Sequence, residues 1–180
     1  MPDPYIILAK KTIRRYIENG EIITEREAGD EIIKQKAGVF VSLKIDCKLL
    51  GCIGTIEPYR ANLAKEIISN AISAATQDPR FPPVSREELE KISYSVDVLE
   101  KPEKVADFSM LDSKEYGVIV KSGYKTGVLL PDIEGVDSTE QQVSIALRKA
   151  GISNAEKYDL YRFKVTSHKE DLSHYIIYSW

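Results

Sequence analysis

A cysteine between two glycines is the side chain in this 180-residue chain best suited to covalent chemistry. Cys52 lies between Gly51 and Gly54, directly after an apolar run. A thiol reacts as a nucleophile when a cation, a helix N-terminus or a metal lowers its pKa. Free cysteine is also among the most buried residue types, so Cys52 has a second interpretation as a small core residue. Leu50, its expected neighbour, supplies no charge, so the residues alone favour the buried interpretation.

A second candidate for chemistry is Arg80, which stands with Phe81 among three prolines within five residues, 79–83. Proline restricts the backbone, so this loop is expected to be extended and stiff. One interpretation is a rigid connector in which Phe81 is a buried plug. The other makes Arg80 an anion contact, because a planar guanidinium suits phosphate and carboxylate groups.

We predict that these two candidates form one concave ligand-binding surface. A glycine inside a strand often marks a bulge or the close approach of another backbone or of a ligand, and the backbone beside Cys52 is expected to be uncovered. A predicted helix over residues 61–77, about 25 Å long, separates the two motifs. The loop after Asp78 must therefore fold back to bring Arg80 within about 10 Å of the cysteine. The predicted ligand-binding residues are Gly51, Cys52, Gly54, Thr55, Arg80 and Phe81.

No metal site is expected from the remaining titratable residues. His168 and His174 are six residues apart, which fits no common metal-ligand spacing. The carboxylates of residues 132–137 do not follow the EF-hand pattern and are expected to be solvated. Asp97 falls on the polar face of a predicted strand, where a solvent-facing carboxylate is expected.

The cysteine is positioned by a predicted β-hairpin. Residues 39–45 alternate as a strand does, and Asp46-Cys47 stands where a two-residue turn would fall. A regular register then puts Cys52 on one face with three apolar neighbours. The expected pairs are Ile45 with Lys48, Leu43 with Leu50, and Val41 with Cys52.

The whole pattern predicts an α+β fold, with a mostly antiparallel sheet and three long helices. Helical periodicity follows Pro4, covers residues 61–77 and begins again near Ser138. Further strands are expected at residues 92–99, 118–121, 127–130 and 161–166, and the apolar tail 175–180 is expected to pack. A chain of this length suits one domain.

Composition narrows the class of protein. The formal net charge of −3 gives no general basic field, so nucleic-acid binding would need a local patch. Two cysteines and the lack of a basic-then-apolar leader predict a cytoplasmic protein. No apolar run approaches the ~18 residues that span a membrane, so no membrane association is expected.

Several motifs in order resemble the AMMECR domain family, named from a human syndrome that includes Alport disease and elliptocytosis. The most specific is a Leu-Arg-Gly-Cys-Ile-Gly run, which stands here as Leu-Leu-Gly-Cys-Ile-Gly at residues 49–54. Further matches lie at residues 78–83, 95–99, 127–131 and 149–151, so the resemblance covers nearly the whole chain. Leu50 replaces the family arginine, and Cys47 stands where the family usually has a turn glycine.

The resemblance implies one AMMECR-type domain over residues 1–180, with a larger and a smaller lobe in one compact unit. It implies no established reaction and no cofactor. The resemblance does imply that the protein acts with Memo-type and radical S-adenosylmethionine proteins, in a pathway that modifies an RNA, nucleotide or peptide target. Two functions remain open. The chain is either a binding module that uses the predicted surface, or an enzyme with Cys52 as nucleophile and a base or cation within reach of the sulfur.

Overall fold

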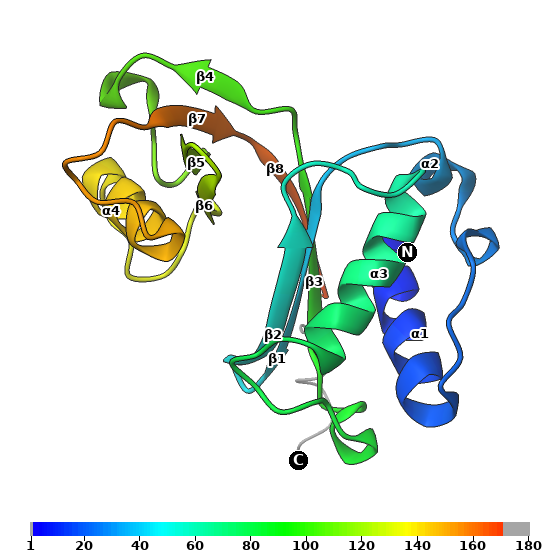
Figure 1. Cartoon of the computed structure of the whole chain (residues 1–180). Coiled ribbons are helices and arrows are strands. Elements are labelled where there is room, and N and C mark those ends of the chain that lie inside the picture. The colour runs from blue at the N-terminus through cyan, green and yellow to red at the C-terminus, as the bar shows by residue number, and fades with distance from the viewer. Residues whose placement is uncertain (1, 171–180) are drawn as a thin grey trace. The chain divides into compact units, whose positions relative to one another are not determined.

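The structure, a computed structural model, describes residues 2–170. The chain divides into two compact units, and each combines an antiparallel sheet with helices (Figure 1). Of the described residues, the first unit contains 2–98 and 167–170, and the second contains 99–166. The predicted α+β class is confirmed.

The sheet of the first unit has the strand order β2-β1-β3-β8. Helix α3 packs on β1 and β2, and α1 packs against α3. Every second residue at the centre of β1 points toward α3, which is why Val39, Val41 and Leu43 are fully buried. The elements are α1 (Pro4–Asn19), β1 (Val39–Ile45), β2 (Lys48–Thr55), α3 (Leu63–Thr76), β3 (Ser93–Leu99) and β8 (Val165–Lys169).

The second unit has its own sheet, in the order β4-β7-β5-β6, and its own core. Helix α4 packs on β5 and β6 and buries Val143, Ala146 and Leu147 between the layers. Ser138 caps its N-terminus by accepting a hydrogen bond from the Gln141 N–H, as its residue type predicts. The elements are β4 (Glu103–Val105), β5 (Gly117–Ser122), β6 (Lys125–Leu129), α4 (Thr139–Ala150) and β7 (Asp159–Phe163).

The C-terminal strand prediction needs correction, because the single strand expected at residues 161–166 is two strands. The chain leaves β7 at Phe163 and enters β8 at Val165, and these strands belong to different sheets. Lys164 lies at the break, and its carbonyl accepts a hydrogen bond from the Glu100 N–H at 2.9 Å. Period-two alternation does not reveal which sheet a strand joins. The expected packing of residues 175–180 lies outside the described residues.

The remaining elements are short. The charged segment after α1 contains a 3₁₀ turn and the four-residue helix α2. Two further 3₁₀ turns precede β3 and β5, and the first has a capping box formed by Ser85 and Glu88. Their bounds are η1 (Glu25–Glu27), α2 (Asp30–Ile33), η2 (Arg86–Glu88) and η3 (Phe108–Met110).

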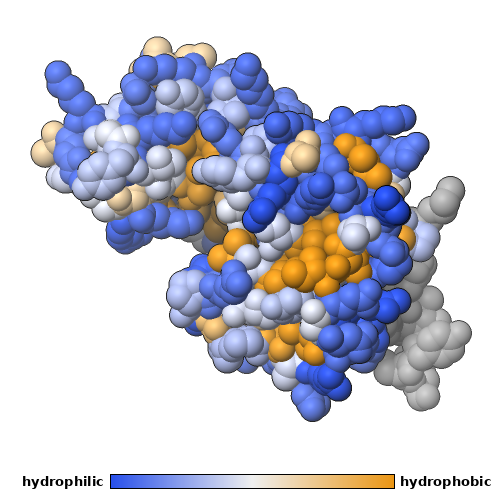
Figure 2. All heavy atoms as spheres, turned by 45° about the vertical axis from the view of Figure 1, so that its right-hand side comes forward, coloured by the Kyte–Doolittle hydropathy of each residue, from blue (hydrophilic) through white to orange (hydrophobic). Residues whose placement is uncertain are grey.

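Hydrophilic side chains cover much of the face drawn in Figure 2, around smaller areas of apolar atoms. Among residues 2–170, the exposed large aliphatic side chains include Ile7, Ile22 and Ile133. A search of the same residues finds no helix with the length and apolar character that crossing a bilayer requires.

Candidate functional site

The hairpin turn that precedes Cys52 is the one predicted. Asp46 and Cys47 have φ angles of 48° and 64°, and such left-handed pairs form type I′ turns. A cysteine is a poor residue for this conformation, in which glycine or asparagine is preferred. The turn therefore forms at some cost in backbone strain at Cys47.

The predicted register of the hairpin is wrong beyond its first pairs, because a β-bulge interrupts β2. Lys44 pairs with Leu49, but Leu43 pairs with Gly51, so Leu50 is the extra, unpaired residue. A one-residue shift moves every following side chain to the other face of the sheet.

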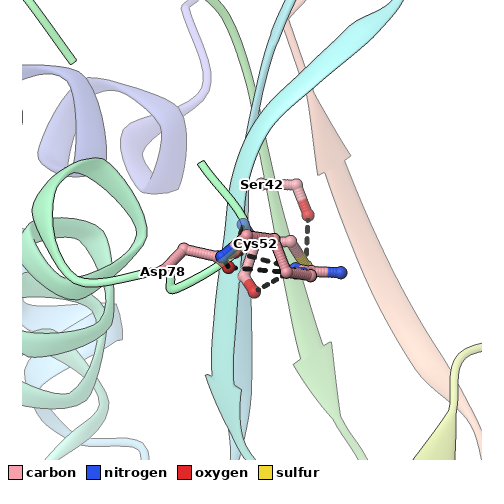
Figure 3. Close-up of polar contacts among 4 residues, drawn as sticks. Ser42, Cys52 and Asp78 are labelled. Atoms are coloured by element: carbon pink, nitrogen blue, oxygen red, sulfur yellow. Dashed lines mark hydrogen bonds and ion pairs between the residues drawn. The ribbon is translucent and has the colours of Figure 1, made fainter. Parts of the chain in front are cut away.

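Cys52 therefore pairs with Ser42, not with Val41, and lies on the sheet face opposite α3. The Ser42 hydroxyl donates to Cys52 Sγ at 3.1 Å (Figure 3). The thiol is half-buried, so it is neither the fully buried core residue nor a fully exposed group.

The backbone of Cys52 is held at the outer edge of the sheet by two side chains. Strand β2 is an edge strand, and the Cys52 N–H donates to Asp78 Oδ2 at 3.0 Å (Figure 3). Arg80 Nη2 donates to the Cys52 carbonyl oxygen at 3.2 Å. An acceptor for the N–H and a donor for the C=O are what a neighbouring strand would supply. The side-chain pair thus caps this part of the sheet edge.

Asp78 and Arg80 are joined to each other by three hydrogen bonds. Arg80 donates from Nε to Oδ1 at 3.0 Å, from Nη2 to Oδ2 at 2.7 Å, and from its backbone N–H to Oδ1 at 3.1 Å. The guanidinium carbon also lies 5.2 Å from the centre of the Phe81 ring. These contacts fix the plane of the guanidinium and its position beside the half-buried Phe81.

Helix α3 brings Asp78 to Cys52 because it runs antiparallel to β2. Near its N-terminus, Glu66 accepts a hydrogen bond from the Thr55 hydroxyl, and near its C-terminus Ala74 lies against Gly51. The residues after α3 therefore arrive beside Cys52 directly. The prediction that the loop must fold back along the helix is wrong, although the predicted proximity of Arg80 to Cys52 is present.

The positive charge of Arg80 is compensated by the carboxylate of Asp78. The hydrogen bonds from Arg80 hold the pKa of Asp78 well below its usual range, against the opposing effect of burial. The same interaction raises the pKa of Arg80. The Asp78 side chain is 2% exposed and that of Arg80 is 57% exposed. The surface therefore exposes the guanidinium of Arg80, whose positive charge is compensated by the buried carboxylate of Asp78.

The two glycines are covered, which contradicts the expectation of free backbone. A Cβ at Gly51 would lie 2.0 Å from the Ala74 carbonyl oxygen, and one at Gly54 would lie 2.2 Å from the Phe40 ring. Gly51 is needed where α3 crosses β2, and Gly54 is needed where the Phe40 ring covers the strand.

Thr55 also has a structural role. Its hydroxyl donates to the buried Glu66 at 2.9 Å and accepts from Asn70 Nδ2 at 3.2 Å. Of the six predicted site residues, Gly51, Gly54 and Thr55 support the frame. Cys52, Arg80 and Phe81 remain at the surface.

Sequence reasoning missed three residues that hold this site: Asp78, Ser42 and Glu66. Asp78 could have been found, since a carboxylate two residues before an arginine in a stiff loop can pair with it. Ser42 was hidden by the bulge. Glu66 stands among the buried positions of α3 and carries charge, which marks it as a residue with specific partners. Its Oε2 accepts from the backbone N–H groups of Tyr59 and Arg60.

Asp97 lies on the same sheet face as Cys52, where it is half-buried and hydrogen-bonded. Its register partner on β1 is Phe40, two residues from Ser42. Burial raises the pKa of Asp97, while a hydrogen bond from the Ser167 hydroxyl at 2.6 Å opposes that shift.

His168 is engaged away from the cysteine. Its Nδ1 lies 2.7 Å from Asp3 Oδ2, and its ring stacks on Tyr5 at 3.8 Å. Within residues 2–170, no three His, Cys, Asp or Glu side chains are grouped to hold a metal, and this includes the loop 132–137. His174 lies outside the described residues.

Comparison with known proteins places the chain in a family. A protein of Thermotoga maritima is 52% identical over 169 residues, which are 92% of this chain and 97% of that protein. A Clostridium acetobutylicum protein is 50% identical over 93% of this chain but only 36% of its own length. The crystal structure of an uncharacterised protein from Pyrococcus horikoshii matches with a TM-score of 0.86 and 30% identity, over 93% of this chain and 90% of that one. The AMMECR1 family profile matches residues 6–168, and the chain therefore belongs to the AMMECR1 family.

Proposed function

We propose that this AMMECR1-family chain is a binding module whose contact surface is formed by Cys52, Arg80 and Phe81 at the edge of β2. The observation that carries the proposal is the Arg80 guanidinium, which is fixed by Asp78 and by the Cys52 carbonyl yet is more than half exposed. A donor held in place before binding loses little conformational entropy when a ligand arrives. Its Nη1 has no hydrogen-bond partner within residues 2–170 and is available to one.

The chemistry of the surface favours a ligand with a carboxylate or phosphate group. A guanidinium binds carboxylate or phosphate with directed N–H groups, and the adjacent Phe81 ring adds an apolar contact. The buried Asp78 neutralises the charge, so affinity comes from contact geometry more than from long-range attraction. Within the proposed target classes, a peptide or nucleotide suits this surface better than a long RNA backbone.

The partners that we propose are a Memo-type protein and a radical S-adenosylmethionine protein, with the chain acting in the cytoplasm as a single AMMECR-type domain. The Clostridium acetobutylicum relative supports a role beside another protein, because the matched region is only 36% of that polypeptide. A domain that is joined to a longer chain in one relative is suited to act with a partner in another.

A pull-down tests this function directly. The full chain is the bait, the candidate partners from the same cell are the prey, and bound RNA and metabolites are identified by mass spectrometry. Arg80→Lys keeps a cation opposite Asp78 but removes the fork that also reaches Cys52. Arg15→Lys is the matched control, because Arg15, on α1, forms an exposed ion pair with Glu21. We expect capture by the wild type and the control, and much weaker capture by Arg80→Lys. Equal capture by both variants would contradict the proposed surface.

The second candidate function is catalysis by Cys52 as a nucleophile. The observation in its favour is that the Ser42 hydroxyl donates to Sγ while the Arg80 guanidinium lies at the carbonyl of the same residue. Donors and cations near a thiol favour its ionised form. The described histidine, His168, pairs with Asp3, so it is not the base of such a mechanism. The binding module is therefore the better-supported function.

A further inference from the structure

We propose a second ligand site, for a small zwitterion such as an α-amino acid, in a charged cavity of the second unit. The cavity has a volume of about 280 Å³ and is lined by side chains of both charges together with two aromatic residues. This volume lies just below the range that holds drug-sized ligands, so it suits a molecule of amino-acid size. Its charged and aromatic lining residues are Glu100, Lys101, Glu103, Tyr116, Arg162, Phe163 and Lys164.

Arg162 is the fixed group of the cavity. Its Nε donates to Glu103 at 2.9 Å, and its Nη1 donates to the Met110 carbonyl at 2.7 Å. The guanidinium carbon lies 4.4 Å from the centre of the Tyr116 ring, and the side chain is 22% exposed. Nη2 has no partner within residues 2–170. A largely desolvated guanidinium with one open nitrogen is a ready contact for a carboxylate.

A second cation shares the same aromatic ring. Lys164 Nζ lies 5.5 Å from the Tyr116 ring centre and pairs with Glu115 at 3.0 Å. Two cations beside one ring repel each other, and each is balanced by its own glutamate. The two cations are held in place, and together with their glutamates they carry little net charge. Such a site suits a ligand that is itself neutral overall.

Lys101 and Glu100 supply two further charges. Neither side chain forms a hydrogen bond or an ion pair with another residue in the described part of the chain, although Glu100 interacts electrostatically with Lys164. The backbone of Glu100 is held by its N–H bond to Lys164. The carboxylate of an amino acid would contact Arg162 Nη2 and Lys101, and its ammonium group would contact Glu100. A simple anion would satisfy only half of this arrangement.

The test is a titration of the full chain followed by ¹H–¹⁵N NMR, with the twenty common α-amino acids added one at a time. We expect at least one of them to shift the amide signals of Lys101, Arg162 and Lys164 saturably, with a Kd of about 1 mM or tighter. Acetate and methylammonium, which carry one charge each, should bind at least about tenfold more weakly.

Two variants locate the site. Lys101→Ala and Glu100→Gln should each weaken binding about tenfold or more, and neither breaks an existing ion pair. Lys114→Ala, which removes an exposed pair with Asp132 in the same unit, is the control and should bind as the wild type does. The proposal is overturned if no amino acid saturates these signals, if acetate binds as well as the amino acid, or if Lys101→Ala leaves the Kd unchanged. The site is independent of the surface at Cys52, so neither result decides the other.

Discussion

Asp78 determines the local chemistry at the edge of β2. A carboxylate that is 2% exposed is costly to bury, and here Arg80 and the Cys52 N–H compensate for that cost. Removing Arg80 would leave this charge buried without its main partner. We therefore expect Arg80→Ala to lower the free energy of unfolding by about 3 kcal/mol. Arg80→Lys is the better functional probe for this reason.

The pH dependence of stability should report on Asp78. Its folded pKa is lowered, so the unfolded chain binds more protons and stability rises with pH through this window. The contribution is complete above the unfolded value of about 3.9 and is lost as the pH falls toward the lower folded value. Urea titrations should show Asp78→Asn less stable than the wild type by about 2 kcal/mol at pH 7, with a smaller difference at pH 3.

The control for that titration is Asp46→Asn, at an exposed turn position that suits asparagine. It shows what an Asp→Asn exchange does at an exposed position. A difference for Asp78→Asn that does not change with pH would show that Asp78 is not the group that titrates.

Alkylation distinguishes the two proposed roles of Cys52, as part of a binding surface or as a nucleophile. The sulfur is half-buried beside Ser42, so iodoacetamide should react slowly with it in the native chain and quickly after unfolding. Cys47, exposed at the turn, is the internal reference and should react at once. Mass spectrometry of the two peptides gives both rates. Rapid native reaction of Cys52, with a midpoint well below the ~8.5 of a free thiol, would favour the nucleophile.

At the scale of elements, the close packing of β2 against α3 makes a strong prediction. Gly51→Ala places a Cβ 2.0 Å from the Ala74 carbonyl, and backbone must move to admit it. We expect a loss of about 3 kcal/mol in the free energy of unfolding, since overpacking of a well-filled site typically costs this much. Gly29→Ala, whose nearest neighbour is 4.0 Å away, should cost less than about 1 kcal/mol. Equal losses of stability in the two variants would mean that the close approach of α3 to β2 does not depend on Gly51.

The bulge at Leu50 explains how far the sequence could predict the site. Periodicity and turn residues were sufficient to predict the hairpin, the three long helices and the helix start at Ser138. A bulge leaves no clear mark on an alternating pattern, yet it decides which face the thiol occupies. The direction of α3 relative to β2 is also a tertiary property, so the short path from Asp78 to Cys52 could not be read from spacing.

At the scale of the whole molecule, charge limits the partners. The chain carries a formal net charge of −3. At the proposed surface, the positive charge of Arg80 is compensated by Asp78. We expect affinity for random duplex DNA no better than ~10⁻⁴ M at physiological salt, measured by fluorescence anisotropy. Micromolar affinity that falls steeply with added salt would reveal a basic surface that these charges do not predict.

Hydrogen–deuterium exchange of the full chain, alone and with the captured partner and its ligand, tests the proposed binding surface most directly. Binding at Cys52, Arg80 and Phe81 predicts slower exchange in peptides from residues 49–56 and 79–84. Exchange in the cavity around Arg162 should stay unchanged by that partner, which makes the second unit an internal control. A partner that binds while exchange over residues 49–56 and 79–84 stays the same, and slows elsewhere, would contradict the binding surface at the edge of β2.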